Sequence, residues 1–258
     1  MPEPTSEEVT IVVPCRNEEA TLEKVIRECW ETCSPKMQVR FLAVDDDSDD
    51  GTPAILSKLA RSMPLKVVRN DSPLGFGGAL TKGISLVSTP WVAFNDADGQ
   101  YYPEDLNRLF EARDGADRMI TGWRVRRADP KIRTFISLIF QIMNRVAFRL
   151  RMKDITTSLK LGRTDRVQEI APQVVFMNGS FWTEFMVRWV NAGYSYREVQ
   201  IRHKPRANNV RSKVFETGRI GRLVLHQFVG FFRLFTAIRG SRVEGSPLST
   251  ANRVQSSK

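Results

Sequence analysis

The fold is decided by a stretch that joins an apolar run directly to a cluster of acids, Val39-Arg40-Phe41-Leu42-Ala43-Val44-Asp45-Asp46-Asp47, and by a second stretch of the same design, Trp91-Val92-Ala93-Phe94-Asn95-Asp96-Ala97-Asp98. The apolar runs are rich in β-branched and aromatic residues and stop at acids followed by glycine, which is typical of buried strands. In an open parallel sheet, such strands end at the edge where ligands bind. We therefore expect both acidic clusters at one edge of a sheet.

The second cluster has the spacing of a metal site. Asp96 and Asp98 are two residues apart, so an extended chain would direct both carboxylates to the same side. Hard oxygen ligands of this kind suit Mg²⁺ or Mn²⁺, and such an ion can neutralise a diphosphate. One acid-rich turn could be a solvated strand end, but two turns at matching positions favour a nucleotide and metal site.

Strand and helix patterns alternate from Val9 to about residue 117. Asn17 is expected to cap a helix after the strand at 9–13, and the glycine segment Gly75-Phe76-Gly77-Gly78 is expected to open a later one. This segment lacks the spacing of a P-loop and of a dinucleotide fingerprint, so a tight helix start is favoured over a phosphate cradle. The alternation predicts an α/β fold with a mainly parallel sheet flanked by helices.

Charge is divided unevenly along the 258 residues, of which 41% are hydrophobic and 26% charged, as in ordinary globular proteins. Residues 1–117 hold 12 Lys and Arg against 21 Asp and Glu, whereas residues 118–258 hold 27 against 8. The acidic half suits metal chemistry and the basic half suits an anion, which could be nucleic acid, a membrane surface or a phosphorylated acceptor. Three cysteines form no disulfide framework and are expected to be structural, in a reducing cytoplasmic setting.

Two amphipathic helices are expected in the basic half. Residues 131–151 place arginine and polar side chains on one stripe and apolar side chains on another. Residues 219–239 do the same with a phenylalanine-rich face, and their uncharged run of about ten residues is half of what a bilayer requires. For the first helix, packing and acceptor binding remain equal alternatives. The second is expected to lie on an anionic membrane surface, and its alternative is packing on the core or on a partner subunit.

Three motifs resemble family 2 of the inverting glycosyltransferases: the opening Val9-Thr10-Ile11-Val12-Val13-Pro14-Cys15-Arg16-Asn17-Glu18-Glu19, the Val-Asp-Asp-Asp-Ser cluster at 44–48, and the Asp-Ala-Asp-x-Gln cluster at 96–100. Within that family the chain is most similar to polyprenyl-phosphate sugar transferases of the dolichyl-phosphate mannosyltransferase type. Four weaker segments carry this closer resemblance: Gly122-Trp123-Arg124, residues 131–137, residues 154–160, and Arg206 through Ser212-Lys213. The resemblance covers roughly residues 9–215.

The resemblance implies a GT-A-type nucleotide-binding fold and an enzyme. The reaction would move a hexose from a nucleotide sugar, of the GDP-mannose or UDP-glucose type, to a polyprenyl or dolichyl phosphate with inversion, using Mg²⁺ or Mn²⁺. The expected organisation is a flexible N-terminus at 1–8, one glycosyltransferase domain at 9–215 with a donor and metal half at 9–117 and an acceptor half at 118–215, a membrane-surface helix at 216–240, and a disordered tail at 241–258.

The resemblance also assigns site residues. Asp98 and Gln100 would be metal ligands, and the groups acting in catalysis would be Asp96, Asp98, Arg124 and Arg133. The donor-binding residues would be Pro14, Arg16, Glu18, Val44, Asp46, Asp47, Asp96 and Ala97. The acceptor-binding residues would be Arg124, Arg133, Ser137, Arg206 and Lys213. The enzyme would lie on the cytoplasmic membrane face, with a membrane-anchoring subunit or a second copy as a further partner.

Two segments depart from the family pattern. Thr157-Ser158-Leu159 stands where the family has Ser-Gly-Phe, and the segment from Arg206 to Lys213 lacks a glycine and has one extra residue, so Arg211 could replace Arg206. The alternatives are therefore a family 2 enzyme with a glycan, metabolite or other lipid as acceptor, a nucleic-acid binder, or an inactive scaffold. Carboxylates clustered at strand ends argue against the last two, because binding nucleic acid does not require them, and we expect no nucleic-acid partner.

Overall fold

A seven-stranded sheet forms the centre of the computed structural model, which describes residues 8–114, 117–125, 131–205 and 220–243. The strand order is β3-β2-β1-β4-β6-β5-β7, and every pairing is parallel except those of β6 with β4 and β5. The strands are β1 Val9–Cys15, β2 Val39–Asp45, β3 Leu65–Arg69, β4 Trp91–Phe94, β5 Arg118–Arg124, β6 Lys160–Arg163 and β7 Ser195–Ile201. The mainly parallel α/β sheet is thereby confirmed.

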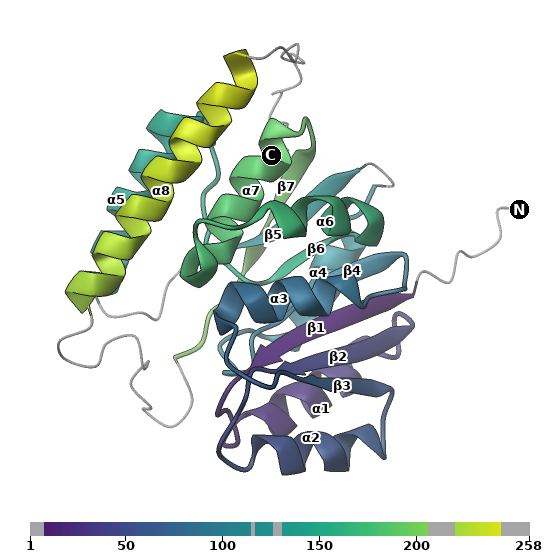
Figure 1. Cartoon of the computed structure of the whole chain (residues 1–258). Coiled ribbons are helices and arrows are strands. Elements are labelled where there is room, and N and C mark those ends of the chain that lie inside the picture. Colours follow the sequence, from purple (N-terminus) through teal and green to yellow (C-terminus); the bar gives the residue numbers. More distant parts are fainter. Residues whose placement is uncertain (1–7, 115–116, 126–130, 206–219, 244–258) are drawn as a thin grey trace, which may run out of the picture.

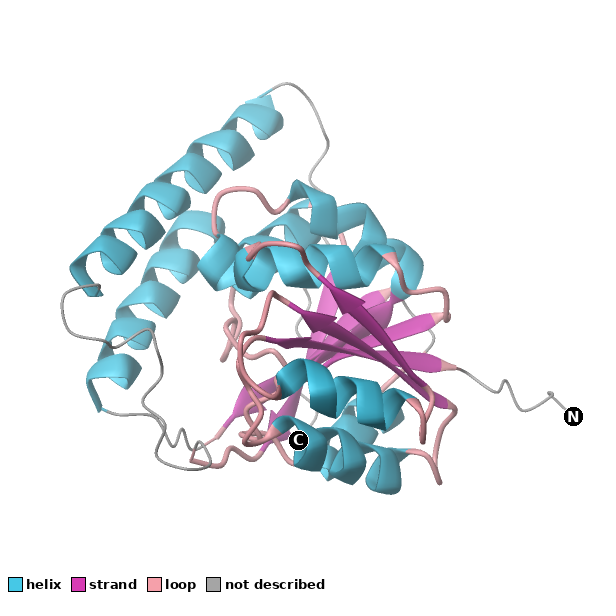
Figure 2. Ribbon diagram, turned by 60° about the horizontal axis from the view of Figure 1, so that its bottom comes forward, coloured by secondary structure: helices cyan, strands magenta, loops and turns pink. Residues whose placement is uncertain are grey.

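Helices cover both faces of this sheet (Figures 1 and 2). Because side chains alternate along each strand, Val12 and Val44 point to one face while Ile11 and Ala43 point to the other. The first face packs against α3 Gly75–Ser85, α6 Thr164–Ile170 and α7 Phe181–Asn191, and the second against α1 Leu22–Cys33, α2 Thr52–Ala60 and α4 Pro103–Glu111. Two short 3₁₀ turns, η1 Ala171–Gln173 and η2 Asn178–Ser180, precede α7.

Two longer helices, α5 Lys131–Phe148 and α8 Ile220–Val243, lie side by side at one end of the molecule (Figures 1 and 2). Phe148 of α5 contacts Phe231 and Phe235 of α8, and α8 buries Leu234 and Ile238 in the core. α5 ends at Phe148, three residues earlier than expected, because Arg149 adopts a left-handed backbone with φ of 57°. α8 continues to Val243, so its last three residues are helical where composition predicted disorder.

The sheet brings the two acidic clusters to one edge. β1 lies between β2 and β4 and runs parallel to both, with Pro14 opposite Val44 and Val12 opposite Phe94. The segments that follow β1, β2 and β4 therefore leave the sheet at its carboxyl edge, as the sequence predicted. β5 also ends at this edge, because it is antiparallel to β6 and β6 is antiparallel to β4.

Candidate active site

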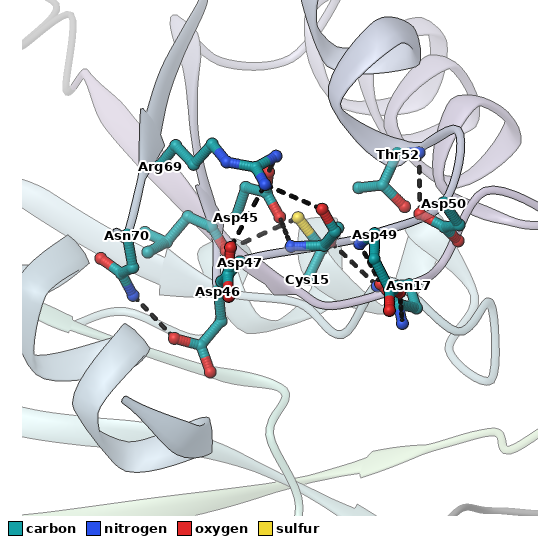
Figure 3. A network of polar contacts seen from close by, with 12 residues as sticks. Cys15, Asn17, Asp45, Asp46, Asp47, Asp49, Asp50, Thr52, Arg69 and Asn70 are labelled. Atoms are coloured by element: carbon teal, nitrogen blue, oxygen red, sulfur yellow. Dashed lines mark hydrogen bonds and ion pairs between the residues drawn. The ribbon is translucent and has the colours of Figure 1, made fainter. Parts of the chain in front are cut away.

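The first acidic cluster, residues 45–50, is bonded to its own surroundings (Figure 3). Asp46 is buried, and its carboxylate accepts hydrogen bonds from Asn70 Nδ2 at 2.7 Å and from the backbone N–H groups of Leu74 and Gly75 at 2.8 and 2.9 Å. Asp45 accepts a hydrogen bond from the Arg69 guanidinium at 2.8 Å. These carboxylates therefore shape the loop after β2 and the start of α3.

Asn17 links the loops after β1 and β2 and does not cap α1, so the predicted cap was wrong. Its backbone has φ of 56°, and α1 begins only at Leu22. The Asn17 side chain donates to the Asp49 carboxylate and accepts a hydrogen bond from Asp49 N at 2.9 Å, while Asn17 N donates to Ser48 Oγ at 3.0 Å. A polar side chain after a strand can cap the next helix or bond to a neighbouring loop, and Asn17 bonds to the neighbouring loop.

This linkage holds the predicted donor-binding residues on two neighbouring loops. Pro14 lies opposite Val44 in the sheet, Arg16 is exposed, and Glu18 is partly exposed with its N–H bonded to Thr52 Oγ1 at 2.9 Å. Asp47 has φ of 59° and forms a 3.3 Å ion pair with Arg69. The structure thus groups these residues beside the strand ends.

The glycine segment at the start of α3 is locked by a residue that sequence reasoning missed. Asn178 in η2 accepts hydrogen bonds from Gly77 N at 2.6 Å and Gly78 N at 3.2 Å, and its Nδ2 donates to Leu74 O at 2.8 Å. Leu74 N and Gly75 N donate to Asp46, so these four amides of the helix start all bond to protein side chains. A helix start was the favoured interpretation of the segment, and the structure agrees.

The second acidic cluster continues the chain beyond β4. Ala97 is buried, and its carbonyl accepts a hydrogen bond from Thr21 Oγ1 at 2.7 Å. Gly99, with φ of 73°, turns the chain so that Gln100 N donates to Asp98 Oδ1 at 3.1 Å. The side-chain Nε2 of Gln100 also donates to Lys204 O at 3.2 Å, which connects this cluster to the residues after β7.

Negative charge is concentrated around Asp96. Burial raises the pKa of Asp96, because the charged form is disfavoured away from water, and Asp98 and Glu18 raise it further. A hydrogen bond from the Ser158 side chain and the charge of Arg124 act in the opposite direction. Groups from both halves of the chain therefore meet at this carboxylate, where an added cation would relieve the repulsion.

A divalent ion fits the chemistry of this cluster. Asp98 and Gln100 offer hard oxygen donors, while within the described ranges no three His, Cys, Asp or Glu side chains gather to hold a metal by themselves. Mg²⁺ in nucleotide enzymes is commonly held by one or two carboxylates together with substrate phosphates. Asp98 and Gln100 would therefore suit an ion that is shared with a diphosphate.

Arg124, the last residue of β5, reaches the same place from the acceptor half. Its guanidinium forms a buried ion pair with Asp154 and donates to Thr156 Oγ1 at 2.9 Å. Arg133 and Ser137 stand four residues apart in α5, while Arg206 and Lys213 lie outside the described residues. Arg124 thus brings a cation of the acceptor half to the sheet edge that carries the acidic clusters.

Sequence analysis did not identify two further buried polar residues, Tyr101 and Lys160. Tyr101 is buried directly after the second cluster, and its hydroxyl accepts hydrogen bonds from Ser158 N at 3.1 Å and Thr157 Oγ1 at 3.4 Å. Lys160 in β6 is fully buried and donates to Thr121 Oγ1 at 2.7 Å. Lys160 could have been found from its neighbours, because a lysine between Leu159 and Leu161 indicates a buried position.

Comparison with known proteins agrees with this geometry. The model of glycosyl transferase family 2 matches residues 10–182. A polyprenol monophosphomannose synthase from Mycolicibacterium smegmatis is 30% identical over 82% of this chain and 86% of its own length. A dolichol-phosphate mannosyltransferase from Pyrococcus furiosus is 30% identical over 42% of this chain and 31% of its length.

Solved structures show the same fold. Glucosyl-3-phosphoglycerate synthase from Mycobacterium tuberculosis, crystallised with Mn²⁺, UDP and phosphoglyceric acid, superimposes with a TM-score of 0.66 at 15% identity. The match covers 89% of this chain and 78% of that one. Together with the motifs at the strand ends, the family match shows that this chain belongs to glycosyl transferase family 2 and is a glycosyltransferase of the GT-A fold.

Proposed function

We propose that this glycosyltransferase moves a hexose from a nucleotide sugar to a polyprenyl phosphate, with inversion at the sugar C1 and with Mg²⁺ or Mn²⁺. The observation that carries the proposal is that Arg124, the last residue of β5, and the acidic cluster after β4 lie at the same edge of the sheet. This edge therefore carries both candidate metal ligands and a cation that could hold a second phosphate. The similarity to a polyprenol monophosphomannose synthase supports the choice of acceptor.

The donor side requires neutralisation of a leaving diphosphate. Asp98 and Gln100 would hold the divalent ion, which as a Lewis acid supplies that neutralisation. Asp96 would bind the donor sugar, and the loops after β1 and β2 would hold the nucleotide. Because these loops are linked through Asn17 and Asp49, the pocket needs little ordering when the donor binds.

The acceptor side requires cations and no general base. A phosphate monoester has its second pKa near about 6, so its oxygen is already largely ionised at neutral pH. That oxygen attacks C1, the bond from C1 to the diphosphate oxygen breaks, and the nucleoside diphosphate leaves with the electron pair. Planar guanidinium groups match phosphate oxygens, so Arg124 and Arg133 are suited to hold this nucleophile, with Ser137, Arg206 and Lys213 beside them.

A donor and acceptor panel tests this function. Thermal shifts with GDP-mannose, UDP-glucose and UDP-N-acetylglucosamine, with and without Mn²⁺, should single out one donor, since a ligand at about one hundred times its dissociation constant stabilises by about 2.7 kcal/mol. Transfer of that sugar to a polyprenyl phosphate should then exceed transfer to diacylglycerol or to a free sugar. A clear preference for either of the other acceptors would reject the polyprenyl-phosphate assignment.

The two-helix end of the molecule suits a lipid surface. Both α5 and α8 expose apolar side chains, among them Val146 at 76% and Phe232 at 67%. Neither helix contains an acidic residue, while α5 has three Lys or Arg and α8 has four Arg. Apolar side chains can enter the headgroup boundary and arginines are attracted to anionic lipid. We infer peripheral attachment to the cytoplasmic membrane face, where a lipid acceptor would be met.

No helix among the described residues is long and apolar enough to cross a bilayer. Because α8 buries Leu234 and Ile238 in the core, the surface is best tested by substitution and not by truncation. Phe228→Ser with Phe232→Ser should reduce flotation with anionic vesicles, whereas Val67→Ser on the distant edge strand β3 should not. Undiminished flotation would reject the lipid surface, and loss of a dimer in the double variant would indicate a subunit interface in its place.

A further inference from the structure

A buried ion pair joins the end of β5 to the segment that precedes β6. Asp154 Oδ2 accepts a hydrogen bond from Arg124 Nε at 2.6 Å, and Asp154 Oδ1 accepts one from Arg124 Nη2 at 2.9 Å. The side chains are only 5% and 4% exposed. Two parallel bonds fix the plane of the guanidinium as well as its position. Arg124 therefore has a single orientation set by Asp154.

Asp154 is itself held from two sides. Thr156 donates to Asp154 Oδ1 from its backbone N–H at 3.3 Å and its hydroxyl at 3.1 Å, and this hydroxyl also accepts from Arg124. Glu198 of β7 accepts hydrogen bonds from Lys153 N at 2.7 Å and Asp154 N at 3.3 Å. The segment that carries the carboxylate is thus anchored to the sheet, and the orientation it imposes on Arg124 is rigid.

The segment that carries Asp154 also contacts the end of the second acidic cluster. Ser158 N and Thr157 Oγ1 donate hydrogen bonds to the hydroxyl of Tyr101, the buried residue that directly follows this cluster. Stability alone does not require the ion pair. Replacing a buried ion pair with apolar residues of similar volume is often neutral or stabilising. The ion pair is therefore better explained by the position that it gives Arg124 than by its contribution to stability.

We propose that Asp154 is a positioning residue for the transfer reaction: it holds the Arg124 guanidinium at the sheet edge that carries the second acidic cluster, so that the cation meets the acceptor phosphate where the sugar C1 is attacked. This inference rests on the proposed function. The Asp154 carboxylate would act only through Arg124 and would not contact substrate. Its loss should therefore affect the acceptor far more than the donor.

Steady-state kinetics of the full chain test this role. Asp154→Asn should lower kcat/KM for polyprenyl phosphate by about a hundredfold, because a displacement near 1 Å can cost that much. The dissociation constant of the donor diphosphate should change by less than about threefold, since the donor loops are untouched. Equal losses for donor and acceptor would overturn the proposal. Arg188→Met is the control: it breaks the 2.7 Å pair between Arg188, which is 14% exposed, and the buried Glu184 in α7. It should leave the acceptor kinetics of the folded fraction unchanged.

A second variant separates positioning from folding, because Asp154→Asn leaves Arg124 buried without its counterion. Arg124→Met combined with Asp154→Leu should fold with little change in Tm and yet lose transfer activity. If this apolar pair kept near-normal transfer, the ion pair would be structural and the inference would be wrong.

A double-mutant comparison tests whether Asp154 acts through Arg124. In an Arg124→Lys background, which lacks the planar fork, adding Asp154→Asn should cost less than about threefold in kcat/KM. Multiplying losses would overturn the proposal. A different acceptor preference of the wild-type chain would instead reject the proposed function, and the same variants would then be compared on that acceptor.

Discussion

The two acidic clusters look alike in sequence and differ in how their charge is balanced. In the first, Asp45, Asp46 and Asp50 each accept hydrogen bonds from backbone N–H groups or cations nearby. In the second, Asp96 lies close to Asp98 and Glu18, and its pKa is raised by burial and by both of these charges. The first cluster is stabilised by the protein, whereas the second would be stabilised by a cation.

This difference shows that the two acid-rich turns contribute in different ways to this chain. Carboxylates that accept backbone hydrogen bonds shape loops, because each bond to a charged group is worth about 1.5 to 3 kcal/mol. Carboxylates that repel one another are costly unless an ion or substrate neutralises them. We therefore expect substitutions in the first cluster to change mainly stability and substitutions in the second to change mainly activity.

The largest effect is expected at Asp98. Asp98→Asn should lower transfer by about 10² to 10³ with the fold intact, because a neutral amide binds a hard cation poorly. Transfer assays over a range of Mn²⁺ concentrations, with circular dichroism for the fold, measure this. Asp50→Asn in the first cluster keeps one side-chain oxygen for the bond from Thr52 N, so it is the control and should keep most activity. Equal losses of activity in the two variants would contradict the comparison.

Asp46→Ala should act mainly on stability. It leaves Asn70 and the N–H groups of Leu74 and Gly75 without their acceptor, so we expect a loss of about 2 to 4 kcal/mol in the free energy of unfolding. Urea unfolding measures this free energy. Asp46→Asn keeps one side-chain oxygen, so it should lose less stability than Asp46→Ala. An unchanged midpoint for Asp46→Ala would show that these bonds do not hold the loop.

Asn178→Ala should have a smaller effect of the same kind. It removes the acceptor of Gly77 and Gly78 and one donor to Leu74, all at the exposed start of α3, where water can replace part of what is lost. We expect about 1 to 2 kcal/mol in urea unfolding. A loss larger than that of Asp46→Ala would place the main anchor of α3 in η2 and not in the first acidic cluster.

A dependence on pH is expected at Lys160. Burial lowers the pKa of Lys160 to about 7 in the folded chain, whereas it is 10.5 when exposed. Between these values the unfolded chain holds the proton and the folded chain does not, so this group makes the chain more stable as pH rises from about 7 to 10.5. Lys160→Met should thus exceed wild type in Tm by more at pH 6 than at pH 10. A Tm difference between Lys160→Met and wild type that grows as pH rises would contradict this prediction.

The sheet and the acidic edge could be predicted from sequence because they depend on local patterns. Apolar runs closed by acids specify strands and their carboxyl ends, and the alternation with helices specifies parallel pairing. β6 gave no such signal, because Lys160 and Gly162 interrupt a strand of four residues. Its antiparallel pairing depends on contacts between distant segments and not on its own composition.

The polar bonds of the site could be predicted less well. Asn17 fits a helix cap by type and position, yet it bonds to Asp49, 32 residues away. Asn178 lies 101 residues from Gly77, and Asp154 lies 30 residues from Arg124. Short-range patterns carry no information about such partners, whereas the positions of Asp96, Asp98 and Arg124 at strand ends follow from the strands themselves.

The central claim is that the second acidic cluster holds a divalent ion together with the donor diphosphate and the first does not. It is tested most directly by titrating Mn²⁺ into the full chain with GDP or UDP present and counting bound ions by electron paramagnetic resonance. The wild type and Asp50→Asn should each bind one ion per chain in the presence of the diphosphate, whereas Asp98→Asn should bind it at least about tenfold more weakly. Equal Mn²⁺ affinity in wild type and Asp98→Asn would contradict the account.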